Sequence, residues 1–215
     1  MDQQTKLKIK PEEIEQESFR IIDAELLEQG IRLTGDTAPV IRRVIHTTAD
    51  FSYVDTMRFS ADAVKLFGEK LLEGARIVTD TEMGKAGINK KKIASFGGEV
   101  LSFMADPEVA EEAKKRGLTR AAVSMTHAAK LPGDTIYVIG NAPTALLTLR
   151  DLIREGKAHP AGIVGVPVGF VNVVYAKEEI MKVCEEFGIP YIVNAGRKGG
   201  SNVAAAVINA VLKAL

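Results

Sequence analysis

Five short apolar runs, separated by stretches of helical periodicity, constrain the fold of this chain more than any other feature of its sequence. The runs are ARIVTD (75–80), EVLSFM (99–104), TIYVIG (135–140), GIVGVPV (162–168) and PYIVNA (190–195). They do not alternate polar with apolar residues, and strands that are apolar on both faces belong in a parallel sheet covered by helices on each side. The pattern predicts an α/β fold with three α/β/α layers, a mostly parallel five-stranded sheet and flavodoxin-like winding.

Helical periodicity fills the chain before, between and after these runs. Before the first run, helices are predicted over 11–29, 38–48 and 60–73, and Asp36 or Thr37 is expected to cap the second of them. Later helices are predicted over 107–115, 119–129, 143–155, 177–187 and 202–214. No repeat, low-complexity segment or linker interrupts the 215 residues. We therefore expect a single domain over 1–215, with residues 1–10 as a flexible N-terminus.

Composition narrows the class of function. The 28 basic and 28 acidic side chains cancel, which removes the long-range attraction that a nucleic-acid binder normally uses. A single cysteine, Cys184, cannot form an internal disulfide, and three histidines without a His/Cys cluster give no reason to expect a metal site. The N-terminus lacks the apolar run of a signal peptide, and no stretch approaches the ~18 apolar residues of a membrane span. A cytoplasmic protein with no nucleic-acid or membrane partner is expected.

Polar and glycine-rich segments follow four of the predicted strands. Ligands of open α/β sheets bind beyond the carboxyl ends of the strands, so these segments are the first candidates for a site. They are TDTEMG (79–84), GNAPT (140–144), PVGF (167–170) and GRKGGS (196–201). Each also has an ordinary interpretation, as a tight strand-to-helix turn, a capped helix start or a solvated loop. Asp80 and Glu82 in the first segment could be paired acids, although a solvated loop is the default expectation.

Two of these segments lead into helices whose first turns suit an anion. Pro143 can take the first helical position after an Asn141 or Ala142 cap, and Ser201 or Asn202 can cap the last helix. Helix N-termini with free amides attract carboxylates or phosphates. GRKGGS nevertheless lacks the spacing of a Walker phosphate loop, and the chain contains no GxGxxG.

His46 stands out by its position on the predicted 38–48 helix. At 100° per residue it points almost opposite the inward apolar stripe, and Arg42 and Arg43 flank it. Such a face could bind a polyanionic ligand beside a histidine that exchanges protons near neutral pH. The neighbouring guanidinium groups favour the neutral histidine until an anion offsets them. The alternative is a solvated helix surface. Ser18 adds a hint, because it interrupts the apolar side of the first helix.

Six segments, in this order, resemble the precorrin-8X methylmutase family of cobalamin biosynthesis over about residues 11–213. They are ESF (17–19), RRVIHTTADF (42–51), IVTDTEMGKAGI (77–88), IGNAPTALL (139–147), GVPVGFV (165–171) and GRKGGSNVAAA (196–206). After GVPVGFV the family usually reads close to AAESK, whereas this chain has NVVYAKEE over 172–179. No ligand role is assigned to that stretch beyond the glycine-proline turn.

The resemblance implies an isomerase that moves a methyl group within ring C of precorrin-8X or cobalt-precorrin-8, to give hydrogenobyrinic or cobyrinic acid. It also implies a corrinoid macrocycle as substrate, no cofactor, no metal site of the protein, and a homodimer with active sites at the subunit interface. The catalytic histidine of the family aligns with His46, and substrate contacts align with Ser18 and Arg43. Further substrate contacts are expected at Thr81, Met83, Asn141, Thr144, Gly169, Arg197, Gly199 and Ser201.

Two other functions suit the same fold. A flavin- or nucleotide-dependent oxidoreductase would need an amide-rich phosphate loop directly after the first strand, where TDTEMG offers acids. A corrinoid-binding protein without catalysis would explain the loops, but it gives His46 no role and predicts binding without turnover.

Overall fold

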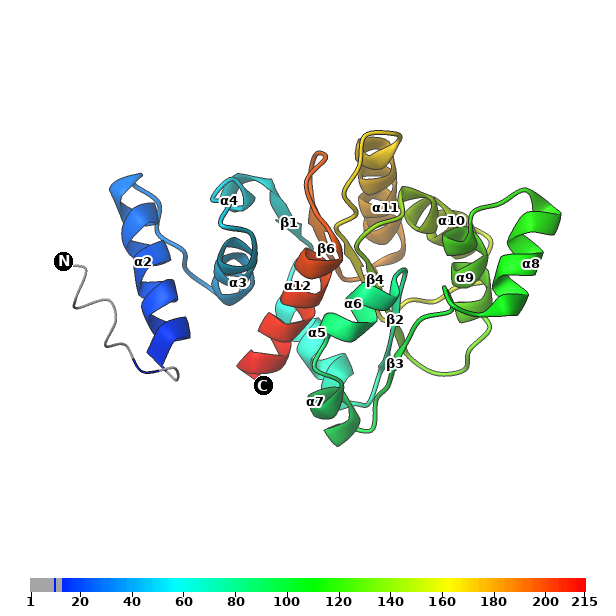
Figure 1. Ribbon diagram of the computed structural model, residues 1–215, viewed down its shortest axis with the longest axis horizontal. Helices are drawn as coiled ribbons and strands as arrows, with labels where there is room; N and C mark the ends of the chain where they lie inside the picture. The colour runs from blue at the N-terminus through cyan, green and yellow to red at the C-terminus, as the bar shows by residue number, and fades with distance from the viewer. Residues whose placement is uncertain (1–9, 11–12) are drawn as a thin grey trace.

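A six-stranded sheet lies between two layers of helices in the computed structural model, which describes residue 10 and residues 13–215 (Figure 1). The strands are β1 (Met57–Phe59), β2 (Arg76–Thr79), β3 (Val100–Leu101), β4 (Thr135–Ile139), β5 (Gly162–Gly165) and β6 (Tyr191–Asn194). Their order is β1-β6-β5-β4-β2-β3, and only β1 runs antiparallel to its neighbour. All five predicted strands are present and parallel, which confirms the predicted fold class. The expectation of a flexible segment over 1–10 lies, except for residue 10, outside the described residues.

The winding of the parallel strands locates the crevice of the sheet. Counted along the chain from β2 to β6, they lie side by side in the order 2-1-3-4-5, which is the flavodoxin-like order. The chain reverses its direction of winding between β2 and β4, which are direct neighbours. In open sheets, ligands bind at such a switch point, outside the carboxyl ends of the strands.

The helices divide between the two faces of the sheet. One face carries α3 (Ala38–Thr48), α5 (Ala63–Leu72) and α12 (Ser201–Ala214), and α2 (Ile14–Glu28) packs on α3. The other face carries α9 (Arg120–Ala128), α10 (Pro143–Arg154) and α11 (Val173–Phe187), and α8 (Pro107–Arg116) packs on α9. The part of the chain that the structure describes also has three short helices, α4 (Tyr53–Thr56), α6 (Glu82–Gly87) and α7 (Lys90–Ser95). None of the described helices has the length and apolar content needed to cross a bilayer.

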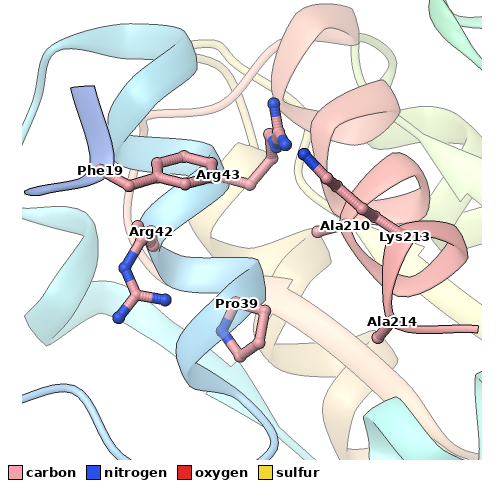
Figure 2. A pocket seen from close by; sticks show the side chains of 7 residues that line it. All are labelled: Phe19, Pro39, Arg42, Arg43, Ala210, Lys213 and Ala214. Carbon is pink, nitrogen blue, oxygen red and sulfur yellow. The ribbon is translucent and has the colours of Figure 1, made fainter. Parts of the chain in front are cut away.

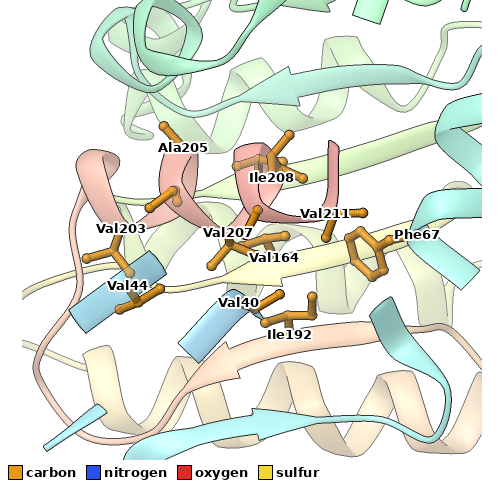
Figure 3. Packing of buried hydrophobic residues seen from close by; sticks show 14 of the residues in the cluster. Val40, Val44, Phe67, Val164, Ile192, Val203, Ala205, Val207, Ile208 and Val211 are labelled. Atoms are coloured by element: carbon orange, nitrogen blue, oxygen red, sulfur yellow. The ribbon is translucent and has the colours of Figure 1, made fainter. Parts of the chain in front are cut away.

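Packing between α3 and α12 places the end of one helix beside the start of the other. Val40 and Val44, one helical turn apart on α3, are both fully buried against α12 and the sheet. Figure 3 shows Val44 beside Val203, and Val40 nearer to Val207 and to Ile192 of β6. Each such side chain contributes roughly 1.5–3 kcal/mol by leaving water. The last turn of α3, which carries His46, is therefore held at the same end of the molecule as the first turn of α12.

The structure adds a sixth strand to the predicted five and corrects one helix boundary. Strand β1 was not predicted, because Met57–Phe59 is short and its central residue is exposed, as expected for an edge strand. Helix α11 begins at Val173 and not at 177, because Val173, Ala176 and Ile180 share one buried face at helical spacing. The segment 172–179, to which no ligand role was assigned, is thus the first half of a helix.

Candidate active site

A buried carboxylate fills the crevice at the switch point. Asp80 follows β2 and is 1% exposed. Its two oxygens accept hydrogen bonds from the backbone N–H groups of Gly140 (2.8 Å), Asn141 (2.9 Å) and Ala142 (2.6 Å), at the start of α10. Burial raises the pKa of this carboxyl group, and the three N–H donors oppose that shift. The expectation of a solvated loop is wrong for Asp80. Since it satisfies these amides, they are not free to bind a ligand.

The start of α12, at the same edge of the sheet, is not capped in this way. Gly200 is its N-cap, and no side-chain cap is present in the described part of the chain, so the expected Ser201 or Asn202 cap is wrong. Ser201 is instead the first helical residue, and its Oγ lies 2.7 Å from Oγ1 of Thr81. A Cβ on Gly140 would lie 2.7 Å from the Cα of Ser201, so the glycine lets β4 end against this helix. The start of α12 remains a candidate anion site.

The loops after β5 and β6 lie against each other beside that helix start. The N–H of Gly169 donates to the carbonyl of Arg197 at 3.2 Å. A Cβ on Gly199 would collide with the carbonyl oxygen of Val166, so only glycine allows this approach. The guanidinium of Arg197 lies 5.6 Å from the centre of the Phe170 ring, and both side chains are exposed. The two loops thus present a cation and an aromatic ring to solvent.

His46 lies on the exposed side of α3, as the periodicity predicted. Its ring meets the ring of Phe19 edge to face, with centroids 5.4 Å apart and planes at 72°. Burial lowers the pKa of this histidine, and the charge of Arg43 lowers it further. Arg42 instead pairs with Asp23 at 2.8 Å. Burial and the charge of Arg43 both favour the neutral imidazole, which has one N–H to donate.

Arg43 already has a partner in the structure. Its Nη1 lies 2.7 Å from Glu15 of α2, and its guanidinium lies 4.9 Å from the centre of the Phe19 ring. Lys213 of α12 pairs with the same carboxylate and lies 5.9 Å from the same ring. A pocket of about 210 Å³ is lined by Phe19, Pro39, Arg42, Arg43, Ala210, Lys213 and Ala214 (Figure 2). We call Glu15, Phe19, Arg43 and Lys213 the α2 clasp.

The predicted site residues fall into two groups that one lysine connects. At the strand ends lie Thr81, Met83, Asn141, Thr144, Gly169, Arg197, Gly199 and Ser201, and on α2 and α3 lie Ser18, Arg43 and His46. Lys198 connects the groups, since its Nζ lies 2.6 Å from Asp50 and 2.9 Å from Ser52, directly after α3. The loop before α12 is thereby tied to the segment that follows His46.

Two of the predicted contact residues, Ser18 and Thr144, already have hydrogen-bond partners within the chain. The hydroxyl of Ser18 donates to the carbonyl of Ile14 at 2.8 Å, and Oγ1 of Thr144 lies 2.8 Å from that of Thr119. Asn141 is exposed beside the Asp80 bonds, and Met83 is 70% exposed on α6. Met83, Asn141 and Arg197 are therefore the exposed side chains among the predicted contacts at the strand ends.

Two aromatic residues of the site, Phe19 and Phe170, were missed from the sequence. Lys198, which the sequence offered as a cation for substrate carboxylates, instead pairs with Asp50, and Asp80, offered as one of two paired acids, instead binds backbone amides. Phe19 and Phe170 stood inside the quoted segments ESF and GVPVGFV, and an aromatic residue in a polar strand-end loop was a usable signal. Nothing in the sequence indicated the partners of Asp80, which lie 60 to 62 residues further along the chain.

Sequence comparison places known proteins close to this chain. A family model described as precorrin-8X methylmutase matches residues 13–214. The cobalt-precorrin-8 methylmutase of Priestia megaterium is 42% identical over 214 residues, which cover 98% of this chain and 92% of that protein. The precorrin-8X methylmutase of Pseudomonas aeruginosa is 36% identical over 92% of this chain and 93% of its own length.

A solved structure agrees with these sequences. The crystal structure of precorrin-8X methylmutase from Thermus thermophilus superimposes with a TM-score of 0.81 at 41% sequence identity, covering 94% of this chain and 96% of that one. Fold and sequence therefore agree over nearly the whole chain, which belongs to the precorrin-8X methylmutase family.

Proposed function

We propose that this chain isomerises precorrin-8X or cobalt-precorrin-8 by moving a methyl group from the alpha carbon of ring C to the adjacent beta carbon. One carbon–carbon bond breaks and another forms within the macrocycle, so the atoms balance without a second reactant. The observation that carries the proposal is the exposed His46 beside Arg43, at the end of α3 in a chain that matches methylmutases almost throughout. Any cobalt arrives inside the macrocycle, as part of the substrate.

His46 is the group that donates a hydrogen bond or a proton to the macrocycle. Charge develops on the ring system as the methyl group migrates, and a donor placed there stabilises the transition state more than the ground state. General acid catalysis of this kind contributes typically ~10²–10⁴-fold. A substrate carboxylate that approaches Arg43 offsets the charge that lowers the pKa of His46, so binding makes the histidine easier to protonate.

The peripheral carboxylates of the substrate need positive groups, and the described residues offer two places. Arg197 is exposed beside the uncapped start of α12, where a guanidinium and helix amides can meet one carboxylate. Arg43 lies next to His46 but pairs with Glu15, so a substrate carboxylate there has to share or displace that side chain. The start of α10 contributes through the side chains of Asn141 and Thr144, since Asp80 takes its amides.

A homodimer with its active site at the subunit interface is part of the proposal. The face of α3 that carries His46 points away from the core of its own chain, so a second wall is needed to exclude water from the reaction. Light scattering of the active enzyme tests the dimer. A cytoplasmic location and a single domain over residues 1–215 also remain predictions.

Replacement of His46 tests the proposed function. His46→Ala removes an exposed side chain, so the fold should survive within about ±0.5 kcal/mol. The single-turnover rate with metal-free and with cobalt-containing precorrin-8X should fall at least ~10²-fold, while corrinoid binding persists. His159→Ala, an exposed histidine before Pro160, is the matched control and should keep the wild-type rate.

Two outcomes would contradict the proposal. A stable His46→Ala protein with most of the wild-type rate would remove the histidine from the mechanism. A wild-type protein that binds both corrinoids and converts neither would be the non-catalytic binding protein considered above.

A further inference from the structure

Lys177 is a buried cation for which the proposed mechanism has no use. It lies in the first half of α11 and is 1% exposed. Its Nζ donates to the backbone carbonyl oxygens of Gly196 and Lys198, both at 2.8 Å. Burial lowers the pKa of this amine to about 8. Within residues 13–215 it forms no ion pair with a carboxylate, so the backbone carbonyls alone hold it.

A buried amine costs free energy unless its hydrogen bonds compensate. The rest of this helix face is apolar, since Ala176, Ile180 and Val183 are fully buried beside it. An apolar side chain would fill the same place without that cost, so what the lysine adds is its pair of hydrogen bonds.

Both of its acceptors belong to the loop that joins β6 to α12. The Gly196 carbonyl is part of the peptide group before Arg197, and the Lys198 carbonyl is part of the peptide group before Gly199. The Lys198 carbonyl also accepts a bond from Asn194 Nδ2 at 2.9 Å. Lys177 therefore fixes two peptide planes of a segment that has no helix or strand of its own.

We infer that Lys177 is a positioning residue, which sets the 195–200 loop and so places Arg197 and the first amides of α12 for the carboxylates of the corrinoid. The inference rests on the proposed function. A loop that is ordered before binding loses less conformational freedom when the ligand arrives. The effect of Lys177 is therefore on affinity, and the methyl migration itself depends on it little.

Three variants separate this role from a general role in packing. Lys177→Met keeps the apolar stem and removes the donors, whereas Lys177→Arg keeps charge and donors. Lys182→Met is the control on the same helix, since Lys182 is 65% exposed and pairs with Glu179. Absorbance titration with hydrogenobyrinic acid should show about tenfold weaker binding for Lys177→Met, partial recovery for Lys177→Arg, and a change below about twofold for Lys182→Met. At saturating substrate, the single-turnover rate of Lys177→Met should stay within about threefold of wild type.

A double-mutant cycle supplies a measurement that packing alone would not change. Arg197→Ala should weaken corrinoid binding about tenfold in the wild type, and less than about threefold in the Lys177→Met background, because the arginine is then no longer in place. Equal losses in both backgrounds, or unchanged affinity of folded Lys177→Met, would overturn the inference. If Lys177→Met does not fold, the same cycle is run with Lys177→Gln, which shortens the side chain and removes its charge.

Hydrogen exchange separates this inference from the proposed function. The N–H of Gly200 donates to Val166 at 2.9 Å, and its exchange in the ligand-free protein should be at least about tenfold faster in Lys177→Met than in Lys182→Met. Unchanged exchange at Gly200 would overturn the positioning role even if the enzyme is a methylmutase. If exchange at Gly200 is faster in Lys177→Met but the wild type binds no corrinoid, the positioning role of Lys177 stands and the proposed function is refuted.

Discussion

Helices α10 and α12 both begin at the carboxyl edge of the sheet, and buried ions of opposite sign hold the backbone before them. Before α10 the ion is the Asp80 carboxylate, which accepts hydrogen bonds from three backbone N–H groups. Before α12 the ion is the Lys177 ammonium, which donates to two backbone carbonyls. The carboxylate uses up the amides at its helix start, whereas the ammonium leaves those of α12 without a side-chain cap among the described residues.

The difference shows that a helix N-terminus at a switch point is not by itself a ligand site. The positive end of a helix dipole attracts an anion, and the protein can supply that anion itself. In the flavodoxin-like order, the loop after β2 is the place where a phosphate loop would be expected, and here that loop carries Asp80. An acidic side chain at this place would repel a phosphate group, which argues against the oxidoreductase alternative. The family match supports the isomerase.

Removing the charge of Asp80, which holds the backbone before α10, should have the largest effect on stability. Asp80→Asn leaves one carbonyl oxygen for three backbone donors and turns an amide N–H₂ towards them. Because these groups are buried, the free energy of unfolding should fall by about 3 kcal/mol or more in urea denaturation. Glu82→Gln, at an exposed carboxylate two residues away, is the control and should stay within about ±0.5 kcal/mol. An Asp80→Asn protein with the wild-type midpoint would show that the carboxylate does not hold this helix start.

Titration of Lys177 should have the next largest effect. Its pKa is about 8 in the folded protein against 10.5 as the ordinary value, so between these pH values the unfolded chain keeps a proton that the folded chain has lost. The free energy of unfolding of the wild type should therefore rise relative to Lys177→Met as pH increases from 8 to 10.5, by roughly 2–3 kcal/mol. Urea denaturation of both proteins across this range measures the difference. Parallel pH curves would mean that this amine titrates normally and is not buried.

Removing the cation beside α12 should affect binding and leave the fold unchanged. Arg197 is exposed, and its charge-assisted bond to a substrate carboxylate should be worth about tenfold in affinity. Arg197→Ala should therefore bind corrinoid about tenfold more weakly and with a smaller dependence on salt, as titrations at two ionic strengths would show. Lys157→Ala, another exposed cation, is the control because it pairs only with Glu155 among the described residues. Equal effects of the two substitutions would mean that Arg197 contributes only to net charge.

The smallest effect is expected at Ser201. Its hydroxyl pairs with Thr81 at 2.7 Å, and it does not cap α12. Ser201→Ala should lower the free energy of unfolding by about 1 kcal/mol or less in urea denaturation. A loss above about 2 kcal/mol would mean that the Ser201 hydroxyl holds the start of α12 much as Asp80 holds the start of α10. The two helix starts would then not differ in this respect.

Much of the fold was predictable from the sequence, because it depends on local patterns. Strands that are apolar on both faces predicted the parallel sheet, and a period of 100° per residue placed His46 on the exposed side of α3. The edge strand β1 was missed because three residues with an exposed centre give no such pattern. The start of α11 was missed because Val173 and Ala176, which share its buried face, come directly after the glycine-proline turn and were read as part of the loop.

The candidate site was less predictable, because its bonds join residues far apart in the chain. Asp80 meets amides 60 residues away, and Arg43 meets a carboxylate 28 residues before it. Sequence patterns identified these side chains as charged and left their partners open. Whether a charge is free for a ligand depends on those partners, and Arg43, predicted to contact the substrate, has Glu15 and Phe19 of the α2 clasp as its neighbours.

The α2 clasp has a practical consequence for anyone who handles this protein. A carboxylate shared by Arg43 and Lys213 helps to fasten α2, and all three charges are partly exposed to solvent. Ions in the buffer screen such pairs, whereas the apolar contacts between α3 and α12 do not weaken with added salt. The ionic strength of the buffer will therefore act on the surroundings of His46 more than on the apolar packing of α3 against α12. Purification at high ionic strength and assay at low ionic strength would sample two different attachments of the same helix.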